Sequence, residues 1–315
     1  MSFPINAGGN SYDSARGIAS LSDGSSIAIG VFHGTATFGS TTLTSAGDSD
    51  TYIAKLDSAG NYLWVTQVGG DAEDEDGGFG ITALYDGSSI VTGAFDGTAS
   101  FGDTTLTSSG NDDIYVAKLN AEGSFIWATQ AGADGEDAGH AITALSDGNS
   151  IVTGNFRGTA TFGSITLTSA GEDDIFVAKL DADGNYLWAT GAGGIGEDEV
   201  EGHSSLSDGS SILTGSFEGS ATFGSTTLTS AGGDDIFIAK LDSNGNYLWA
   251  TSAGGIGEDV GSGISTLSDG SSIVTGEFKG SATFGSTTLT SACDDDICIA
   301  QLHSNGTWLS ATPAP

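Results

Sequence analysis

Apolar and polar residues alternate in short runs along this chain, and turn-forming pairs such as Asp-Gly separate the runs. The clearest example is ISTLSDGSSIVTGEF, residues 264–278, in which two alternating runs flank Asp269 and Gly270. Asp-Gly between such runs is a strong local signal for a β-hairpin. Helical periodicity appears nowhere, so the pattern predicts an all-β protein.

The same hairpin phrase recurs five times. Its leucine marks the copies, which are 63, 61, 61 and 61 residues apart: Leu21, Leu84, Leu145, Leu206 and Leu267. Each copy predicts four main strands and a short β-arm. In the first copy we expect the main strands at 17–23, 26–32, 51–57 and 61–67, and the arm at 35–38 and 41–44. The units then cover approximately 7–67, 68–130, 131–191, 192–252 and 253–312.

A period near 60 residues with four strands is typical of a propeller blade. We therefore predict one domain, residues 1–315, that forms a five-bladed β-propeller with blades of about 61 residues. A right-handed β-solenoid is the alternative, since 61 residues are close to three coils of about 20. Two-residue turns favour antiparallel hairpins, and therefore the propeller.

The two ends of the chain resemble the same strand. Aligning Ala7–Gly9 with Ala253–Gly255 places Phe3 at the position of Trp249. An open array would need polar caps at its ends. The sequence therefore predicts a ring that the N- and C-terminal strands close within one blade.

The charge is extreme, with 41 acidic and 7 basic residues and a net charge of −34. Nucleic acid and anionic membrane surfaces are poor partners for such a field. Cations, basic proteins and neutral glycans remain possible partners. No stretch of 18 apolar residues predicts membrane insertion, and the start, MSFPINAGG, lacks the regions of a signal peptide.

The two cysteines, Cys293 and Cys298, lie in SACDDDICIA. Their spacing is compatible with a small disulfide loop and equally with two buried free thiols. A lone CxxxxC pair does not predict a zinc site.

Positions that are the same in the repeats are expected to serve the blade. An aspartate opens the third main strand, where it can cap a turn by accepting backbone N–H bonds: Asp50, Asp113, Asp174, Asp235 and Asp296. A lysine of that strand is expected to lie along the blade and pair with an acidic loop: Lys55, Lys118, Lys179 and Lys240. Aromatic residues are expected to pack between blades, with sugar stacking as the alternative for the tryptophans: Trp64, Trp127, Trp188, Trp249, Phe38, Phe101, Phe162, Phe223 and Phe284.

Acidic residues between glycines precede the first strand of each unit. Such oxygen-rich clusters fit calcium, which takes six to eight oxygen ligands. Solvated turn loops are the simpler interpretation, and the EF-hand pattern is absent. The candidate ligands are Asp13, Asp74, Asp76, Glu136, Asp137, Glu197, Asp198, Glu258 and Asp259.

One position differs in every unit, directly after the phenylalanine of G-x-F-x-G. A different polar residue in each copy predicts five unlike surface points around the ring, the candidate ligand-binding set: His33, Asp96, Arg157, Glu218 and Lys279. Drift without selection would give the same pattern.

Enzymatic activity is not predicted. The four histidines occupy unrelated positions of the repeat, and neither GxSxG nor HExxH occurs. The many acidic pairs are not evidence for glycoside hydrolysis.

The phrases LWATSAGGIGEDVGSGIS, DGSSIVTGEF and DDIFIAKLD resemble the bacterial β-propeller repeat family first recognised in seven-bladed proteins. The resemblance covers nearly the whole chain in five copies, and the chain departs from it by its longer GTATFGSTTLTSAG arm. It implies a bacterial propeller, often secreted or attached to the cell surface and without enzymatic activity.

These observations predict a non-enzymatic module of a secreted or cell-surface protein that binds a glycan or a protein through repeated sites, since several weak sites give avidity. A structural spacer with calcium-stabilised acidic loops is the alternative. A mineral- or ice-facing surface built from the threonine rows (TATFGSTTLTS) is a third hypothesis.

Overall fold

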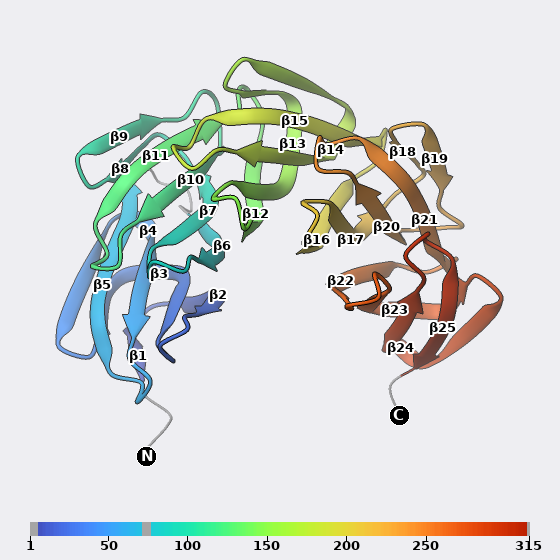
Figure 1. Ribbon diagram of the computed structural model, residues 1–315, viewed down its shortest axis with the longest axis horizontal. Coiled ribbons are helices and arrows are strands. Elements are labelled where there is room, and N and C mark those ends of the chain that lie inside the picture. Colours follow the sequence, from blue (N-terminus) through green and yellow to red (C-terminus); the bar gives the residue numbers. More distant parts are fainter. Residues whose placement is uncertain (1–5, 71–76, 314–315) are drawn as a thin grey trace.

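The computed structural model describes residues 6–70 and 77–313, and in these ranges it contains strands and turns but no helix. The strands pair antiparallel in four sheets. Figure 1 shows repeated four-stranded units that follow one another along an arc. The predicted all-β class and the predicted repeat are therefore confirmed.

Each unit contains four main strands that pair in chain order, and the first strand of each lies on the inner side of the arc (Figure 1). The first two units consist of β2 (Asp13–Ser20), β3 (Ser26–Phe38), β4 (Thr41–Leu56) and β5 (Tyr62–Gly70), then β6 (Gly77–Ala83), β7 (Ser89–Phe95), β10 (Asp113–Leu119) and β11 (Phe125–Ala131). The third and fourth consist of β12 (Asp137–Ala144), β13 (Ser150–Phe162), β14 (Ile165–Leu180) and β15 (Tyr186–Gly194), then β16 (Asp198–Ser205), β17 (Ser211–Phe217), β20 (Asp235–Leu241) and β21 (Tyr247–Gly255). The fifth consists of β22 (Asp259–Thr266), β23 (Ser272–Phe284), β24 (Thr287–Leu302) and β25 (Trp308–Pro313).

The first strand begins and ends earlier than the sequence pattern predicted, at 13–20 instead of 17–23. The Leu21 N–H donates to the Ser25 carbonyl over 2.9 Å and closes the turn there. The apolar Leu21 is therefore part of the turn, which the alternation of residues could not indicate.

The predicted β-arms are present in every unit. They are separate hairpins in the second and fourth units, β8 (Thr98–Phe101) with β9 (Thr104–Thr107) and β18 (Ser220–Phe223) with β19 (Thr226–Thr229). In the other units they continue the second and third strands. Exposed threonines face each other across the arms, as Thr222 and Thr227 do with their Oγ1 atoms 3.1 Å apart.

The arms also connect neighbouring units, because the outer strand of one unit pairs with the arm of the next. Gly193 of β15 pairs with Thr222 of β18, and Gly254 of β21 pairs with Thr283 of β23. The short strand β1 (Ala7–Gly9) pairs with the first arm in the same register, Gly8 with Thr37. The alignment of Ala7–Gly9 with the end of an outer strand is therefore confirmed.

The described core residues form five clusters, of which four lie between consecutive units and one lies within the first unit. The cluster between the third and fourth units combines Ile175 and Val177 of β14 with Phe217, Phe223 and Phe237, all at most 1% exposed. The predicted burial of the arm phenylalanines is confirmed, since none of them is more than 2% exposed.

We call each contact between consecutive units a joint, and a tryptophan donates a hydrogen bond across each of these joints. The Trp188 Nε1–H donates to the Ser243 carbonyl of the next unit over 3.3 Å, and its ring covers Gly245. The equivalent bonds run from Trp64 to Ala121, from Trp127 to Ala182 and from Trp249 to Ser304. The tryptophans therefore pack between units, as predicted.

The structure differs from the predicted ring closure. Within the described ranges, β1 pairs with β3 and β25 with β24, so the terminal strands belong to different sheets, and Figure 1 shows the first and last units apart. Phe3 lies outside the described residues. The side chains of Ile297 and Ile299 are 58% and 46% exposed, whereas the equivalent Ile236 and Ile238 are fully buried.

Two residues distinguish the outer face of the last unit from the faces that a following unit covers. Ser310 pairs with Gln301 where Trp249 pairs with Lys240 in the preceding unit, so the indole that fastens the other joints is missing. Glu277 is exposed at a position where Ser216 is buried in the preceding unit, and an ionised carboxylate is costly to bury.

The two cysteines are free thiols, and only Cys298 is buried. Among the described residues, no helix is long and apolar enough to cross a membrane.

Candidate functional site

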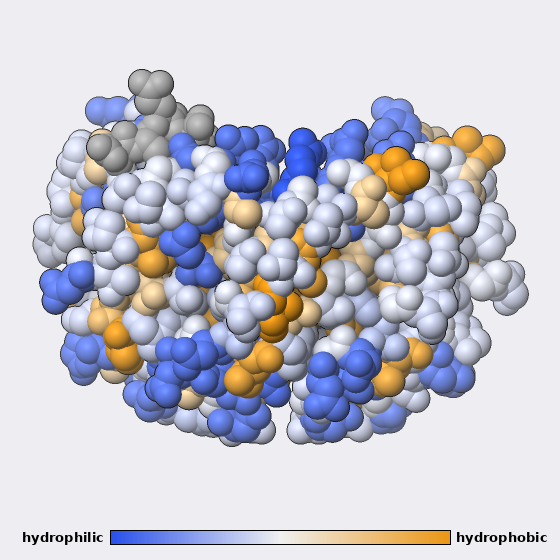
Figure 2. All heavy atoms as spheres, turned by 90° about the horizontal axis from the view of Figure 1, so that it is seen from above, coloured by the Kyte–Doolittle hydropathy of each residue, from blue (hydrophilic) through white to orange (hydrophobic). Residues whose placement is uncertain are grey.

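The strand ends of all units form two edges of the arc. The turn edge carries the Asp-Gly hairpins and the turns between third and fourth strands. The opposite edge carries the arms and the loops that lead from one unit to the next. We call it the aspartate edge, because the third-strand aspartates lie there. Figure 2 shows that hydrophilic residues gather along two opposite margins of the molecule, with most apolar residues between them.

At the turn edge, the Asp-Gly aspartates hold their own turns. The Asp208 Oδ1 accepts the Ser210 N–H over 2.9 Å and the Ser210 hydroxyl over 2.5 Å, and these bonds lower the pKa of Asp208. Gly209 has a φ of +79°, which side chains with a Cβ rarely adopt. The sequence-predicted hairpins thus rest on this local bonding.

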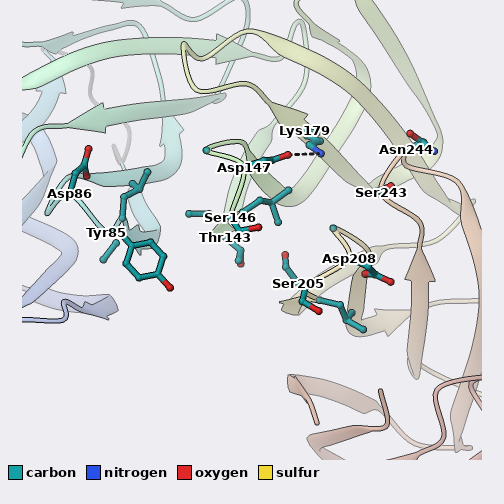
Figure 3. A pocket seen from close by; sticks show the side chains of 18 residues that line it. Tyr85, Asp86, Thr143, Ser146, Asp147, Lys179, Ser205, Asp208, Ser243 and Asn244 are labelled. Atoms are coloured by element: carbon teal, nitrogen blue, oxygen red, sulfur yellow. Dashed lines mark ion pairs between the residues drawn. The ribbon is translucent and has the colours of Figure 1, made fainter. Parts of the chain in front are cut away.

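Three of these turns, from the second, third and fourth units, surround a cavity of about 860 Å³ that we call the turn hollow. Figure 3 shows Asp86, Asp147 and Asp208 around it. Lysine pairing with an acidic turn, predicted from the sequence, is confirmed here, because the Lys179 Nζ lies 3.9 Å from the Asp147 Oδ2. Hydroxyl, amide and carboxylate groups in the lining suit a polar ligand.

Tyr85 stands in the turn hollow as its one large aromatic lining residue, and it is 99% exposed. Figure 3 shows its ring pointing into the open space. The other four units have serine in this register, at Ser22, Ser146, Ser207 and Ser268. Comparing the repeats could therefore have singled out Tyr85, but the sequence analysis missed it.

At the aspartate edge, the aspartates of the third strands cap turns, as predicted. The Asp174 Oδ2 accepts the Ala170 N–H over 3.0 Å, and the Asp296 Oδ2 accepts the Ala292 N–H over 2.8 Å. Gln130 and Gln67 add amide bonds to Asp113 and Asp50.

The acidic loops between units contain two different kinds of carboxylate. Glu136, Glu197 and Glu258 are exposed, as a solvated loop requires. Asp137, Asp198 and Asp259 are fully buried, so the solvated interpretation is wrong for these three aspartates. Asp13 is half-buried and accepts the Gly9 N–H over 2.7 Å, and Asp74 and Asp76 lie outside the described residues.

Each buried loop aspartate meets the third-strand aspartate of the preceding unit, and we call these two residues a joint pair. The three described pairs are Asp113 with Asp137, Asp174 with Asp198, and Asp235 with Asp259. Burial raises the pKa of Asp113 to about 6 and that of Asp137 to about 7, and in Asp137 the charge of Asp113 raises it further. In the next pair, Asp174 and Asp198 have pKa values raised by burial to about 6 and about 7.

The five variable polar residues do not gather in one site. Each lies where the second main strand leads into the arm of its own unit, inside the strand in the first, third and fifth units and directly after it in the second and fourth. We call this place, beside a loop between units, the rim position. The N–H groups of Arg157 and Lys279 donate to Asp137 and Asp259. The Glu218 N–H donates to the Glu197 carbonyl, and the His33 Nδ1 lies 2.9 Å from the Tyr12 carbonyl. Asp96 accepts a bond from the Ser108 hydroxyl.

In the described part of the chain, no group of three or more His, Cys, Asp or Glu side chains is arranged to hold a metal ion. The joint pairs offer two carboxylates each, so a hard cation there would need main-chain or water oxygens in addition.

Comparisons with known proteins give limited similarity. No model of a known protein family matches the chain. An uncharacterized WD repeat-containing protein of Acanthamoeba polyphaga mimivirus is 26% identical over 303 residues, covering 76% of this chain and 22% of that protein. The regulatory protein FlaEY of Caulobacter vibrioides is 28% identical over 141 residues, covering 44% of this chain and 15% of that protein.

The chain therefore spans less than a quarter of the length of either relative. A solved structure of a protein of unknown function from Bacteroides caccae covers 96% of this chain and 82% of its own, with a TM-score of 0.44 and 9% identity. Together with the repeated sheets, the WD repeat-containing relative points to a propeller-type repeat.

Proposed function

We propose that this chain is a non-enzymatic binding module of propeller type, with five units, that recognises a neutral glycan in the turn hollow. The observation that carries the proposal is Tyr85, which is 99% exposed and is the one aromatic residue in a lining of leucines, small residues and polar residues. An exposed tyrosine offers an apolar ring face together with a polar hydroxyl, and such a face can stack on a sugar ring.

The polar lining supports the same ligand class. Ser146, Ser207 and Asn244 offer hydroxyl and amide groups that can bond to sugar hydroxyls, as binding sites with few placed polar groups do. The net charge of −34 disfavours anionic glycans, so neutral sugars fit best. We place such a module in a secreted or cell-surface bacterial protein, where neutral glycans are accessible.

The test is a glycan array followed by calorimetric titration of the best neutral ligand. Tyr85→Ser installs the residue of the other four units, and we expect it to weaken binding at least tenfold without changing the melting temperature. Tyr12→Ser is the matched control, because Tyr12 is 64% exposed at the aspartate edge. Equal affinities of wild type and Tyr85→Ser would refute the site.

A structural spacer is the second candidate, and the repeated joints favour it. It predicts a silent glycan array and tolerance of substitutions at the rim position in every unit.

A further inference from the structure

The first strand of every unit carries a β-bulge at the same register. Each of these strands leaves one residue without a partner on the second strand, between two residues that are paired. A bulge bends its strand and re-aims a side chain, and bulges are frequent next to active sites. Figure 1 shows the first strands on the inner side of the arc, so the bulged residues lie there. We call these residues the bulge row: Arg16, Phe79, His140, Glu201 and Ser262.

Members of the bulge row contact one another from unit to unit. The Arg16 Cζ lies over the Phe79 ring, 5.5 Å from its centre, and the ring centres of Phe79 and His140 are 5.6 Å apart. The His140 Nδ1 lies 3.2 Å from the carbonyl oxygen of Val200, the residue before Glu201. Residues of four units therefore form one continuous series of contacts.

Glycines beside the bulges make these contacts possible. A Cβ added to Gly17 would lie 2.9 Å from the carbonyl oxygen of Phe79, and one added to Gly80 would lie 2.9 Å from that of His140. Larger residues there would push neighbouring first strands apart. The close approach thus brings unlike side chains of successive units together on one surface.

Arg16 is an exposed cation, and in the described part of the chain no acidic side chain is within ion-pairing distance of it. Arg157, the other arginine, bonds Asp173 over 2.8 Å and lies near two glutamates as well. With 41 acidic and 7 basic residues, the composition does not predict an arginine without an acid beside it. A guanidinium supported by an aromatic ring offers a planar fork of donors that fits a carboxylate.

The bulge row is negative at the fourth unit. Glu201 is exposed and Glu199, on the same strand, is half-buried, and neither forms an ion pair within the described ranges. Burial raises the pKa of Glu199, and the charge of Glu201 raises it further, while His140 opposes this rise. The two carboxylates therefore repel each other, and a cationic group of a ligand would relieve the repulsion.

We infer that the bulge row binds a short peptide, with its terminal carboxylate on Arg16 and its amino group at Glu201. The charge of the row runs from positive to negative, and a peptide with free ends presents the opposite order. Such a ligand has no net negative charge, so the field of a chain with a net charge of −34 does not repel it. An extended tetrapeptide covers roughly 13–14 Å, which suits a row whose first two steps are 5.5 and 5.6 Å.

This inference is independent of the proposed glycan site, because the lining of the turn hollow includes no residue of the bulge row. The experiment screens an array of tetrapeptides with free ends against the full-length chain in about 0.15 M NaCl, where diffuse attraction is screened, and measures the best binder by calorimetry. Its carboxyl-terminal amide should bind about tenfold more weakly, because it loses charge-assisted hydrogen bonds. Arg16→Gln should bind the acid no more tightly than the amide. Glu201→Gln should lose the preference for a free over an acetylated amino end.

Two control variants make the same changes of net charge away from the bulge row. Ala59→Glu copies Glu122 of the second unit and matches the loss of positive charge in Arg16→Gln, whereas Glu122→Ala copies Ala59 and matches Glu201→Gln. Both residues are exposed at the turn edge, and both variants should keep the wild-type preferences.

Comparing acid with amide on the same variant separates the site from a general loss of fold. The inference is overturned if no peptide of the array binds, or if acid and amide bind equally to the wild type. It is also overturned if Arg16→Gln or Glu201→Gln keeps the wild-type preference, or if a control variant loses it.

Discussion

A tryptophan ring packs closely against a turn glycine in the joints, and this contact can be tested by adding a single methyl group. Gly245 has a φ of +84°, and a Cβ there would lie 2.7 Å from the Trp188 Cε3. Gly219, in the same unit, has a φ of +70° and no atom within 4 Å of its Cβ position. The pair therefore separates backbone strain from the clash with the indole.

The expected losses in the free energy of unfolding follow from the backbone strain and from the clash with the indole. Gly219→Ala should cost about 1–2 kcal/mol, the penalty of an L-residue in the left-handed region. Gly245→Ala carries the same penalty plus about 1–3 kcal/mol for overpacking. It also weakens the Trp188 bond to Ser243, which is worth about 1 kcal/mol. We therefore expect Gly245→Ala to lose at least about 1 kcal/mol more than its control.

Urea denaturation followed by circular dichroism and tryptophan fluorescence measures both variants, with the midpoint and slope compared at one calcium concentration. The double variant Trp188→Phe/Gly245→Ala checks the cause, since a smaller ring should reduce the excess loss. Equal losses in Gly245→Ala and Gly219→Ala would refute the idea that the indole contact holds the units together.

Other predictions concern single side chains. Burial lowers the pKa of His203 to about 4 from 6.5, so the unfolded chain binds the proton first, and stability should fall as the pH drops from about 6.5 to 4. His203→Ile, which copies Ile142 and Ile264 of other units, should remove that part of the acid slope in thermal unfolding, and an unchanged slope would contradict the assignment. Phe223→Ala should cost about 3–5 kcal/mol in the same denaturation assay, because the ring is 1% exposed between two units. A loss below that of Gly219→Ala would show that the joint does not depend on this ring. Arg157→Ala should cost under about 1 kcal/mol, because its ion pairs are partly exposed, and the loss should shrink in 1 M NaCl. A loss that 1 M NaCl leaves unchanged would argue against an electrostatic role.

Local features were predictable from the sequence. The Asp-Gly turns and the capping role of Asp174 depend on neighbours within one unit, and repetition reveals them five times. The burial of Phe162 and the packing of Trp188 involve two units, yet they were predictable because alternation places both rings on a face that another unit covers.

The other features that depend on two units were not predictable. Asp137 and Glu136 are adjacent in sequence, yet one is buried against Asp113 and the other is exposed, and only the joint geometry separates them. The open arc was equally hard to predict, since Ser310 and Glu277 matter only through the face that they would present to another unit. Tyr85 did have a signal in the sequence, because the other four units have serine at this position. Only a comparison of the units shows this signal, and the alternation of residues within one unit does not.

The overlap of each outer strand with the following arm has a consequence for how such a chain can lengthen. β15 pairs with β18 in the same way as β21 pairs with β23. A duplicated block of 61 residues could therefore pair its arm with the outer strand of the unit before it, and its outer strand with the arm of the unit after it. Growth by gene duplication would therefore require no newly evolved contact, and the curvature of the array, rather than its chemistry, would limit its length.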